Sequence, residues 1–218
     1  MIRNIRNLAA AATLAVSGLA GLGAPTAGAV TMPAEATYIA DMTAGPADPM
    51  TVAVTVDNDK VVAYATNGSN EEAWFFGSQK AGQIDMTSMY ADRIKAVYDG
   101  ATLRGTLTMN GDASPHEFSA AAAPAPAGIY TATMDGSRAS WVVRPDRTIT
   151  GVMDNSAPGD HKVTDALAAQ QQQYRDQVRQ MRLEQQMQQA PPMQYGTWTT
   201  VIHDIPVTAT PVSGAMRF

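Results

Sequence analysis

Residue types that commonly perform catalysis or bind metals are sparse in this chain. It contains no cysteine, and its three histidines (His116, His161 and His203) lie far apart in the sequence. Hydrolytic catalysis needs a nucleophile beside a base, and a zinc site needs three or four clustered ligands. The histidines follow neither an HxH nor an HExxH spacing. We therefore predict a protein that is not an enzyme, with no catalytic residues, no metal site and no cofactor.

Adjacent carboxylates offer the next candidate chemistry. Glu71 and Glu72 can be read as an acid–base pair, but neighbouring side chains on a strand point to opposite faces. The alternation instead places Glu72 on the same face as Trp74 and Phe76. We therefore expect the two glutamates at a solvated strand end.

Aromatic residues on predicted strands are the best candidates for a ligand site. Tyr64, Trp74, Phe76 and Trp141 can line the mouth or the interior of a β-barrel, as in barrels that hold small apolar ligands. Ordinary core packing is the alternative explanation of the same residues. We take these four as the predicted ligand-binding residues.

The elements that would position these residues are short strands. Alternating apolar and polar runs recur over residues 51–154, with turn residues between them. Residues 51–66 predict a hairpin around Asp57-Asn58-Asp59, and residues 102–109 alternate most regularly. The count of about eight or nine strands predicts a mainly β fold, an antiparallel meander that forms a small barrel or a sandwich.

One segment within this region has two interpretations. Met86, Tyr90, Ile94 and Val97 recur at helical spacing, and Thr87 or Ser88 can cap such a helix. A bent pair of strands explains residues 87–98 equally well, so both remain open at this point.

The N-terminus predicts export. Arg3 and Arg6 precede an apolar stretch at residues 8–22, and Ala27-Gly28-Ala29 provides a cleavage signal. We predict a signal peptide at residues 1–29, cleaved near Ala29, and a secreted or cell-envelope protein. The apolar stretch is shorter than the ~20 residues that span a bilayer, so no transmembrane anchor is expected. The net charge of −5 argues against nucleic-acid binding.

The remaining chain divides by composition. We expect an extended lead-in at residues 30–50, an antiparallel β-domain at 51–154, a Gln-rich helix at 160–190 and a polar tail with a possible edge strand at 191–218. The helix holds ten glutamines between Gln170 and Gln189 and only a thin apolar stripe. Self-association through this helix and docking on the sheet are both compatible with such a stripe.

Several segments resemble an uncharacterised family of exported actinobacterial proteins. The similarity covers roughly residues 50–145 and includes Glu72-Ala73-Trp74-Phe75-Phe76-Gly77 and Pro126-Ala127-Gly128-Ile129-Tyr130. The resemblance implies a β-meander behind a signal peptide. The family has no assigned activity, so the resemblance implies no chemistry.

These expectations lead to three functional hypotheses. The first is an exported, non-enzymatic binding or interaction protein of the cell envelope or medium, with an envelope protein as a possible partner. The alternative is a carrier of a small apolar ligand inside a closed β-barrel. The third is an envelope hydrolase whose site is assembled from distant segments.

Overall fold

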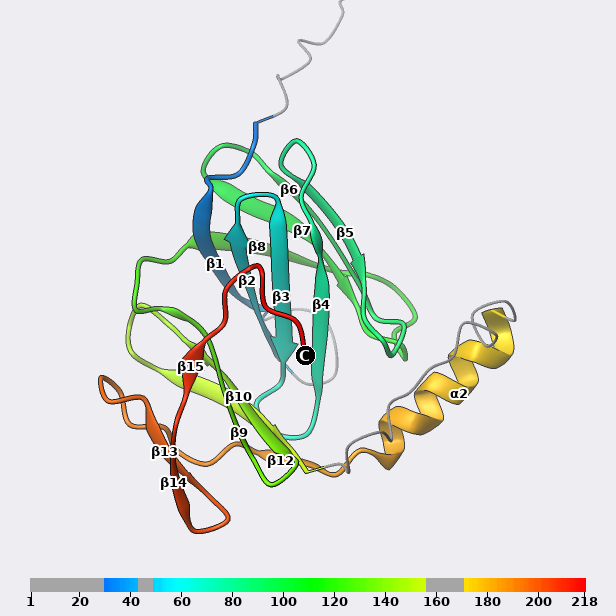
Figure 1. The fold of residues 1–218 in the computed structure, drawn as a ribbon. Coiled ribbons are helices and arrows are strands. Elements are labelled where there is room, and N and C mark those ends of the chain that lie inside the picture. Colours follow the sequence, from blue (N-terminus) through cyan, green and yellow to red (C-terminus); the bar gives the residue numbers. More distant parts are fainter. Residues whose placement is uncertain (1–29, 43–48, 156–170) are drawn as a thin grey trace, which may run out of the picture.

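A computed structural model describes residues 30–42, 49–155 and 171–218 (Figure 1). The predicted signal peptide lies outside these residues. The fold is mainly β and its core is an antiparallel meander, so the predicted fold class is confirmed. In the described part of the chain, the one helix is α2 (Gln171–Glu184), near the C-terminus.

The larger sheet has eight strands that curl into a nearly closed barrel. Their order is β4-β3-β2-β1-β8-β7-β6-β5, so the first and last strands of the meander pair at the centre and β4 and β5 form the two edges. The strands are β1 (Glu35–Met42), β2 (Met50–Asp57), β3 (Lys60–Thr66), β4 (Glu72–Ser78), β5 (Gln83–Thr87), β6 (Arg93–Tyr98), β7 (Thr102–Thr108) and β8 (His116–Ala122).

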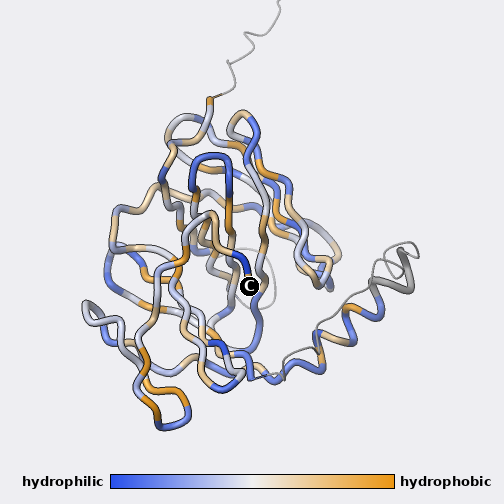
Figure 2. The backbone as a smooth tube through the Cα atoms, viewed as in Figure 1, coloured by the Kyte–Doolittle hydropathy of each residue, from blue (hydrophilic) through white to orange (hydrophobic). Residues whose placement is uncertain are grey.

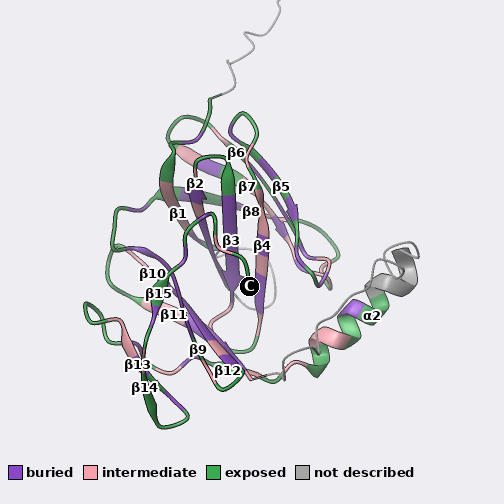
Figure 3. Cartoon of the chain, in the orientation of Figure 1, coloured by how far each residue is buried: buried purple, intermediate pink, exposed green. Residues whose placement is uncertain are grey.

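Alternation of side chains explains how the barrel is filled. On β2, Val52, Val54 and Val56 belong to the interior cluster, and on β7 Leu103 and Leu107 do the same. This cluster consists of hydrophobic side chains that are almost completely buried, as the colouring of β2 and β3 in Figure 3 illustrates. The inward-facing residues thus occupy the inside of the barrel.

The barrel closes at a seam between β4 and β5. These two described strands make no ladder hydrogen bonds with each other, since they are the opposite edges of the sheet. A Cβ atom at Gly77 of β4 would lie 2.7 Å from the Sδ atom of Met86 on β5. The Met86 side chain therefore occupies the space that a side chain at position 77 would need.

Residues 83–98 form two strands joined by a tight turn, so the helical interpretation of residues 87–98 is wrong. Met86 pairs with Ile94 in the antiparallel ladder, and both side chains are buried. Ser88 Oγ accepts hydrogen bonds from the backbone N–H groups of Tyr90 and Asp92, which fixes the turn. The period-two burial of β5 and β6 explains why strands form here.

A second antiparallel sheet covers one side of the barrel. Its order is β12-β11-β10-β9-β15, and a separate hairpin, β13 (Thr199–Ile202) with β14 (Ile205–Thr208), follows in the tail. Tyr64 from the barrel packs with Ile129 and Val142 of the second sheet in a shared buried cluster. The remaining strands are β9 (Gly128–Met134), β10 (Ser137–Val143), β11 (Ile149–Asp154), β12 (Met187–Gln189) and β15 (Thr210–Pro211).

Two segments differ from the expected domain boundaries. The lead-in expected at residues 30–50 contains β1, a central strand whose Tyr38, Ala40 and Met42 are buried in the barrel. Of the helix expected at 160–190, residues 160–170 lie outside the described residues. In the described part, α2 spans Gln171–Glu184, and Met187–Gln189 pair with the edge of β11 instead. At the other edge, β15 provides the edge strand expected in the tail.

Polar residues dominate the surface of α2, as Figure 2 shows. Val178 is buried, and Arg179 donates from Nε to the backbone oxygen of Asn110 at 3.1 Å, after the end of β7. Within the described ranges, no helix is long and apolar enough to cross a membrane.

Candidate functional site

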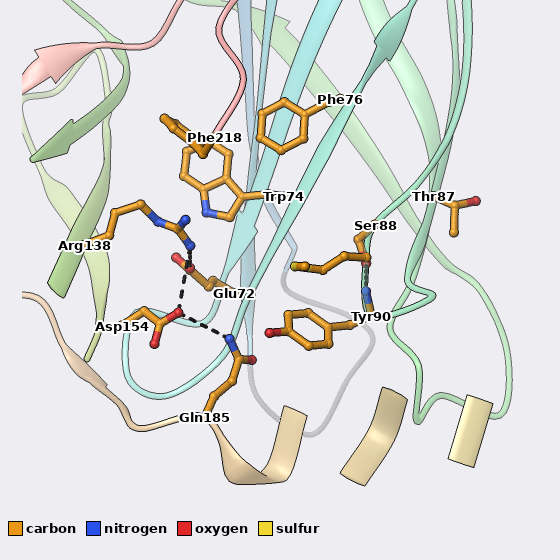
Figure 4. Close-up of a pocket in the computed structure, with 11 residues that line it drawn as sticks. Glu72, Trp74, Phe76, Thr87, Ser88, Tyr90, Arg138, Asp154, Gln185 and Phe218 are labelled. Atoms are coloured by element: carbon orange, nitrogen blue, oxygen red, sulfur yellow. Dashed lines mark hydrogen bonds and ion pairs between the residues drawn. The ribbon is translucent and has the colours of Figure 1, made fainter. Parts of the chain in front are cut away.

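A pocket of about 560 Å³ lies beside the barrel seam (Figure 4). It is bounded by β4, the turn after β5, the facing ends of β10 and β11, the residue that follows α2, and the last residue of the chain. Its lining residues are Glu72, Trp74, Phe76, Thr87, Ser88, Met89, Tyr90, Arg138, Asp154, Gln185 and Phe218.

The aromatic wall comes from the outer face of β4. Phe75 points into the barrel core, so its neighbours Trp74 and Phe76 point outward on the same strand. Their rings are parallel within 5°, with centroids 6.0 Å apart. Phe218 meets Trp74 edge-on at 4.7 Å, and Figure 4 shows it above the indole. The wall is therefore built from one strand and the chain's final segment.

In contrast to the aromatic wall, the floor of the pocket is charged. Glu72 is only 2% exposed, and its Oε1 accepts a 2.7 Å hydrogen bond from Arg138 Nη2. The same nitrogen lies 4.0 Å from Asp154 Oδ2, which also accepts from Gln185 Nε2 at 3.3 Å. The expectation of a solvated strand end is therefore wrong for Glu72, because a cation 66 positions later in the chain pairs with it.

Burial controls the electrostatics of this floor. It raises the pKa of Glu72, and the Arg138 guanidinium only partly offsets that effect. Burial is the largest single influence on the pKa of Arg138 and lowers it, but the nearby Glu72 and Asp154 carboxylates together outweigh burial, so the pKa of the guanidinium is raised. Burial also raises the pKa of the Tyr64 hydroxyl, which lies close to Glu72. Glu72 therefore holds its proton more tightly than an exposed glutamate.

A second ion cluster lies behind the Ser88–Tyr90 side of the pocket. Asp92 is completely buried and pairs with Arg182 of α2. Asp92 also accepts from Ser88 Oγ at 2.5 Å and from the backbone N–H of Asn110 at 2.8 Å. Arg182 reaches Glu71 Oε1 at 3.2 Å and crosses the Tyr90 ring at 5.0 Å. Arg182 thereby fastens the helix to the barrel.

Four polar atoms around the pocket are buried without a hydrogen bond of normal geometry to any described residue. Two are acceptors, Glu72 Oε2 and Gln185 Oε1, and two are donors, Trp74 Nε1 and Arg138 Nε. The Tyr64 hydroxyl lies near Glu72 and lowers the pKa of its carboxyl group. The hydroxyl nevertheless also lacks a hydrogen bond of normal geometry. Such atoms are costly unless water or a ligand satisfies them.

The structure separates the four predicted ligand-binding residues. Trp74 and Phe76 line the pocket. Tyr64 stacks behind Trp74 with ring centroids 4.4 Å apart, but it is completely buried between the barrel and the second sheet. Trp141 packs in the other cluster of the second sheet and donates from Nε1 to the Pro191 oxygen at 3.1 Å. Tyr64, Trp74 and Phe76 are thus brought together outside the barrel core, and Trp141 lies apart.

Sequence reasoning missed the polar half of the site. Arg138, Asp154 and Gln185 come from three other elements, and no local pattern connects them with β4. The available signal was the shared face of Glu72, Trp74 and Phe76. A carboxylate that alternates with two aromatic residues points to the same environment as they do.

The histidines occupy separate places. His203 Nε2 lies 3.1 Å from Ser137 Oγ, a spacing found in nucleophile–base pairs, but neither residue lines the pocket. His116 Nε2 lies 3.4 Å from Asp112, and His161 is outside the described residues. In the ranges that the structure describes, no three His, Asp or Glu residues are grouped to hold a metal ion.

Comparison of the chain with protein-family models, with curated proteins and with solved structures found no match. The resemblance to exported actinobacterial proteins stays a prediction, and the function must be argued from the pocket.

Proposed function

We propose that this protein is an exported, non-enzymatic binding protein that holds a small ligand in the pocket beside the barrel seam. The pocket carries the proposal: about 560 Å³ is within the usual size range of ligand sites. An aromatic wall beside a few buried polar groups is the usual composition of such sites. Export rests on the signal-like sequence at residues 1–29.

The flank of the barrel is a better place for a ligand than its inside. Phe75, Leu103 and Leu107 are each completely buried in the interior cluster, which occupies the barrel. A ligand there would have to displace tightly packed side chains, and close-packed cores do not yield that volume cheaply. The flank pocket needs no such displacement.

Binding without catalysis fits the role of Ser88, one of three hydroxyl-bearing residues that line the pocket. Ser88 Oγ donates to Asp92 and accepts from the backbone N–H groups of Tyr90 and Asp92. These bonds hold the β5–β6 turn in shape, which is a structural role. Ser137 and His203, which have a nucleophile–base spacing, contribute nothing to the pocket lining.

A matched pair of tryptophan substitutions tests the pocket. Met89 lines it and is 47% exposed, whereas Leu183 on α2 is 74% exposed and lies outside the lining. Met89→Trp should fill the cavity and weaken binding of the fluorescent probe N-phenyl-1-naphthylamine at least tenfold. Leu183→Trp should bind the probe like the wild type.

Fluorescence titration of the three proteins measures these affinities, and circular dichroism confirms that each is folded. Equal binding by the wild type and Met89→Trp would contradict the assignment of the pocket. Absence of saturable binding by the wild type would contradict the proposed function as a whole.

A further inference from the structure

We propose that the pocket selects a small organic cation, an amine carried on an aromatic or other apolar body. This inference rests on the proposed function and names the ligand class of the same site. Its basis is a buried, acid-rich polar end beside an aromatic wall, with carboxylate and amide oxygens that lack partners.

Charge balance at the polar end favours a cation. Among the described residues that form the two ion clusters at the pocket, four carboxylates share two guanidinium groups. Arg138 lies between Glu72 and Asp154, and Arg182 lies between Glu71 and Asp92. When all six are ionised, these described residues carry four negative and two positive charges. An anionic ligand would meet this excess, whereas a cation would reduce it. Both guanidinium groups already form ion pairs with carboxylates, although the Nε donor of each has no hydrogen-bond partner.

The unpartnered acceptors match an ammonium group. Glu72 Oε2 belongs to a side chain that is 98% buried (2% exposed), and the carboxylate lies at the pocket floor in Figure 4. Gln185 donates its Nε2 to Asp154, so its Oε1 is an acceptor without a partner. An ammonium group supplies three donors and needs no acceptor, which suits these two oxygens.

The aromatic wall suits the apolar body of the ligand rather than its charge. Arginine side chains already lie over its rings: Arg138 over Trp74 at 5.6 Å, and Arg217 over Phe76 at 5.5 Å. These internal cations compete for the ring faces that an ammonium group would seek. The rings therefore offer stacking and apolar contact, and the carboxylates recognise the charge. A ligand oxygen would also satisfy the unpartnered donor Trp74 Nε1.

Three indole compounds of nearly the same shape test this selectivity: tryptamine (cation), tryptophol (neutral) and indole-3-propionate (anion). Isothermal titration of the full chain at pH 7 and low salt should show tryptamine binding at least tenfold more tightly than tryptophol. Indole-3-propionate should bind most weakly. Met89→Trp should weaken all three, and Leu183→Trp should weaken none.

Charge-removing variants locate the selectivity. Glu72→Gln should reduce the tryptamine preference over tryptophol to below threefold, while Glu117→Gln on the exposed face of β8 should leave it unchanged. Because Glu72→Gln removes the main partner of buried Arg138, Asp154→Asn serves as a second variant and should lower the preference in the same direction.

The outcomes separate the inference from the proposed function. Equal affinities, or a preference for indole-3-propionate, would overturn the choice of a cation while Met89-sensitive binding still supports the pocket. Failure of all three indoles to bind while N-phenyl-1-naphthylamine still binds would overturn the cation as well. Failure of the indoles and of the naphthylamine probe together would overturn the proposed function itself.

Discussion

Strand β4 contributes to both the inside of the barrel and the pocket on its flank, and the side chains on its two faces differ in chemistry. On β4, Ala73 and Phe75 face a cluster whose members are all hydrophobic. On the other side of that strand, Glu72 meets a guanidinium, and Trp74 and Phe76 form the aromatic wall. A period of two residues is therefore enough to place an apolar core and a charged pocket back to back.

The two faces of β4 contribute differently to stability. Burial of apolar surface stabilises a fold by roughly 25 cal/mol per Å², so the barrel interior is the main source of stability. Buried ion pairs gain little net energy because desolvation offsets their attraction, yet removing one partner is strongly destabilising. The flank thus places charged groups at the pocket at a cost in stability.

Truncation of neighbouring phenylalanines should give the largest contrast. Phe75→Ala leaves a cavity in the barrel core and should lower the free energy of unfolding by about 4 kcal/mol. Phe76→Ala should cost only about 1 kcal/mol, because its partly exposed ring leaves an open space that water can enter. Urea denaturation measures both. Similar losses would contradict the assignment of the two faces.

Removal of a buried cation should cause the next largest loss in the free energy of unfolding. Arg182→Met leaves Asp92 completely buried without its counter-charge and should cost about 3 kcal/mol. The matched change is Arg93→Met, whose pair with Asp85 is half exposed and should be worth nothing measurable. Thermal and urea unfolding provide the measurement. An equal effect from both substitutions would show that Arg182 is not buried against the barrel.

A change of pH should have the smallest effect on the free energy of unfolding, because it removes no side chain. Burial raises the pKa values of Glu71, Glu72 and Asp92, so these groups bind protons more tightly in the folded than in the unfolded state. Their contribution to stability is complete below the unfolded pKa of about 4 and is lost as the pH rises through the folded values.

Exposed carboxylates act in the other direction. Hydrogen bonds from Arg93 and from Thr102 lower the pKa values of Asp85 and Asp99, so their contribution is lost as the pH falls below about 4. As the pH falls from neutral, the free energy of unfolding should therefore first rise and then decline below about pH 4. Urea denaturation across this range checks the profile, and Glu72→Gln should flatten its upper part. A steady fall from pH 7 to pH 5 would contradict it.

Sequence patterns predicted the barrel better than the site. Val52, Val54 and Leu107 alternate in the sequence and line the interior, because strand periodicity is a local property. The separation of β9 to β11 into a second sheet depends on which barrel face they cover, and no local pattern encodes that choice. The strands were therefore predictable, but the division into two sheets was not.

The charged half of the pocket illustrates the limit most clearly. Glu72 and Arg138 stand 66 positions apart and meet only because the second sheet packs on the barrel. Each residue alone resembles an ordinary surface charge, since charged residues are seldom fully buried. By contrast, Trp74 and Phe76 share a strand face, so their proximity could be read directly from the alternation.

The seam has a further consequence for behaviour in solution. An unpaired strand edge is a template on which other chains assemble into sheets. In this barrel the two free edges face one another, with the thioether of Met86 filling the notch at Gly77. Each edge therefore blocks the access of strands from other chains to the other edge. A bulky residue at position 77 would separate the two edges and expose their unpaired backbone groups to strands of other chains.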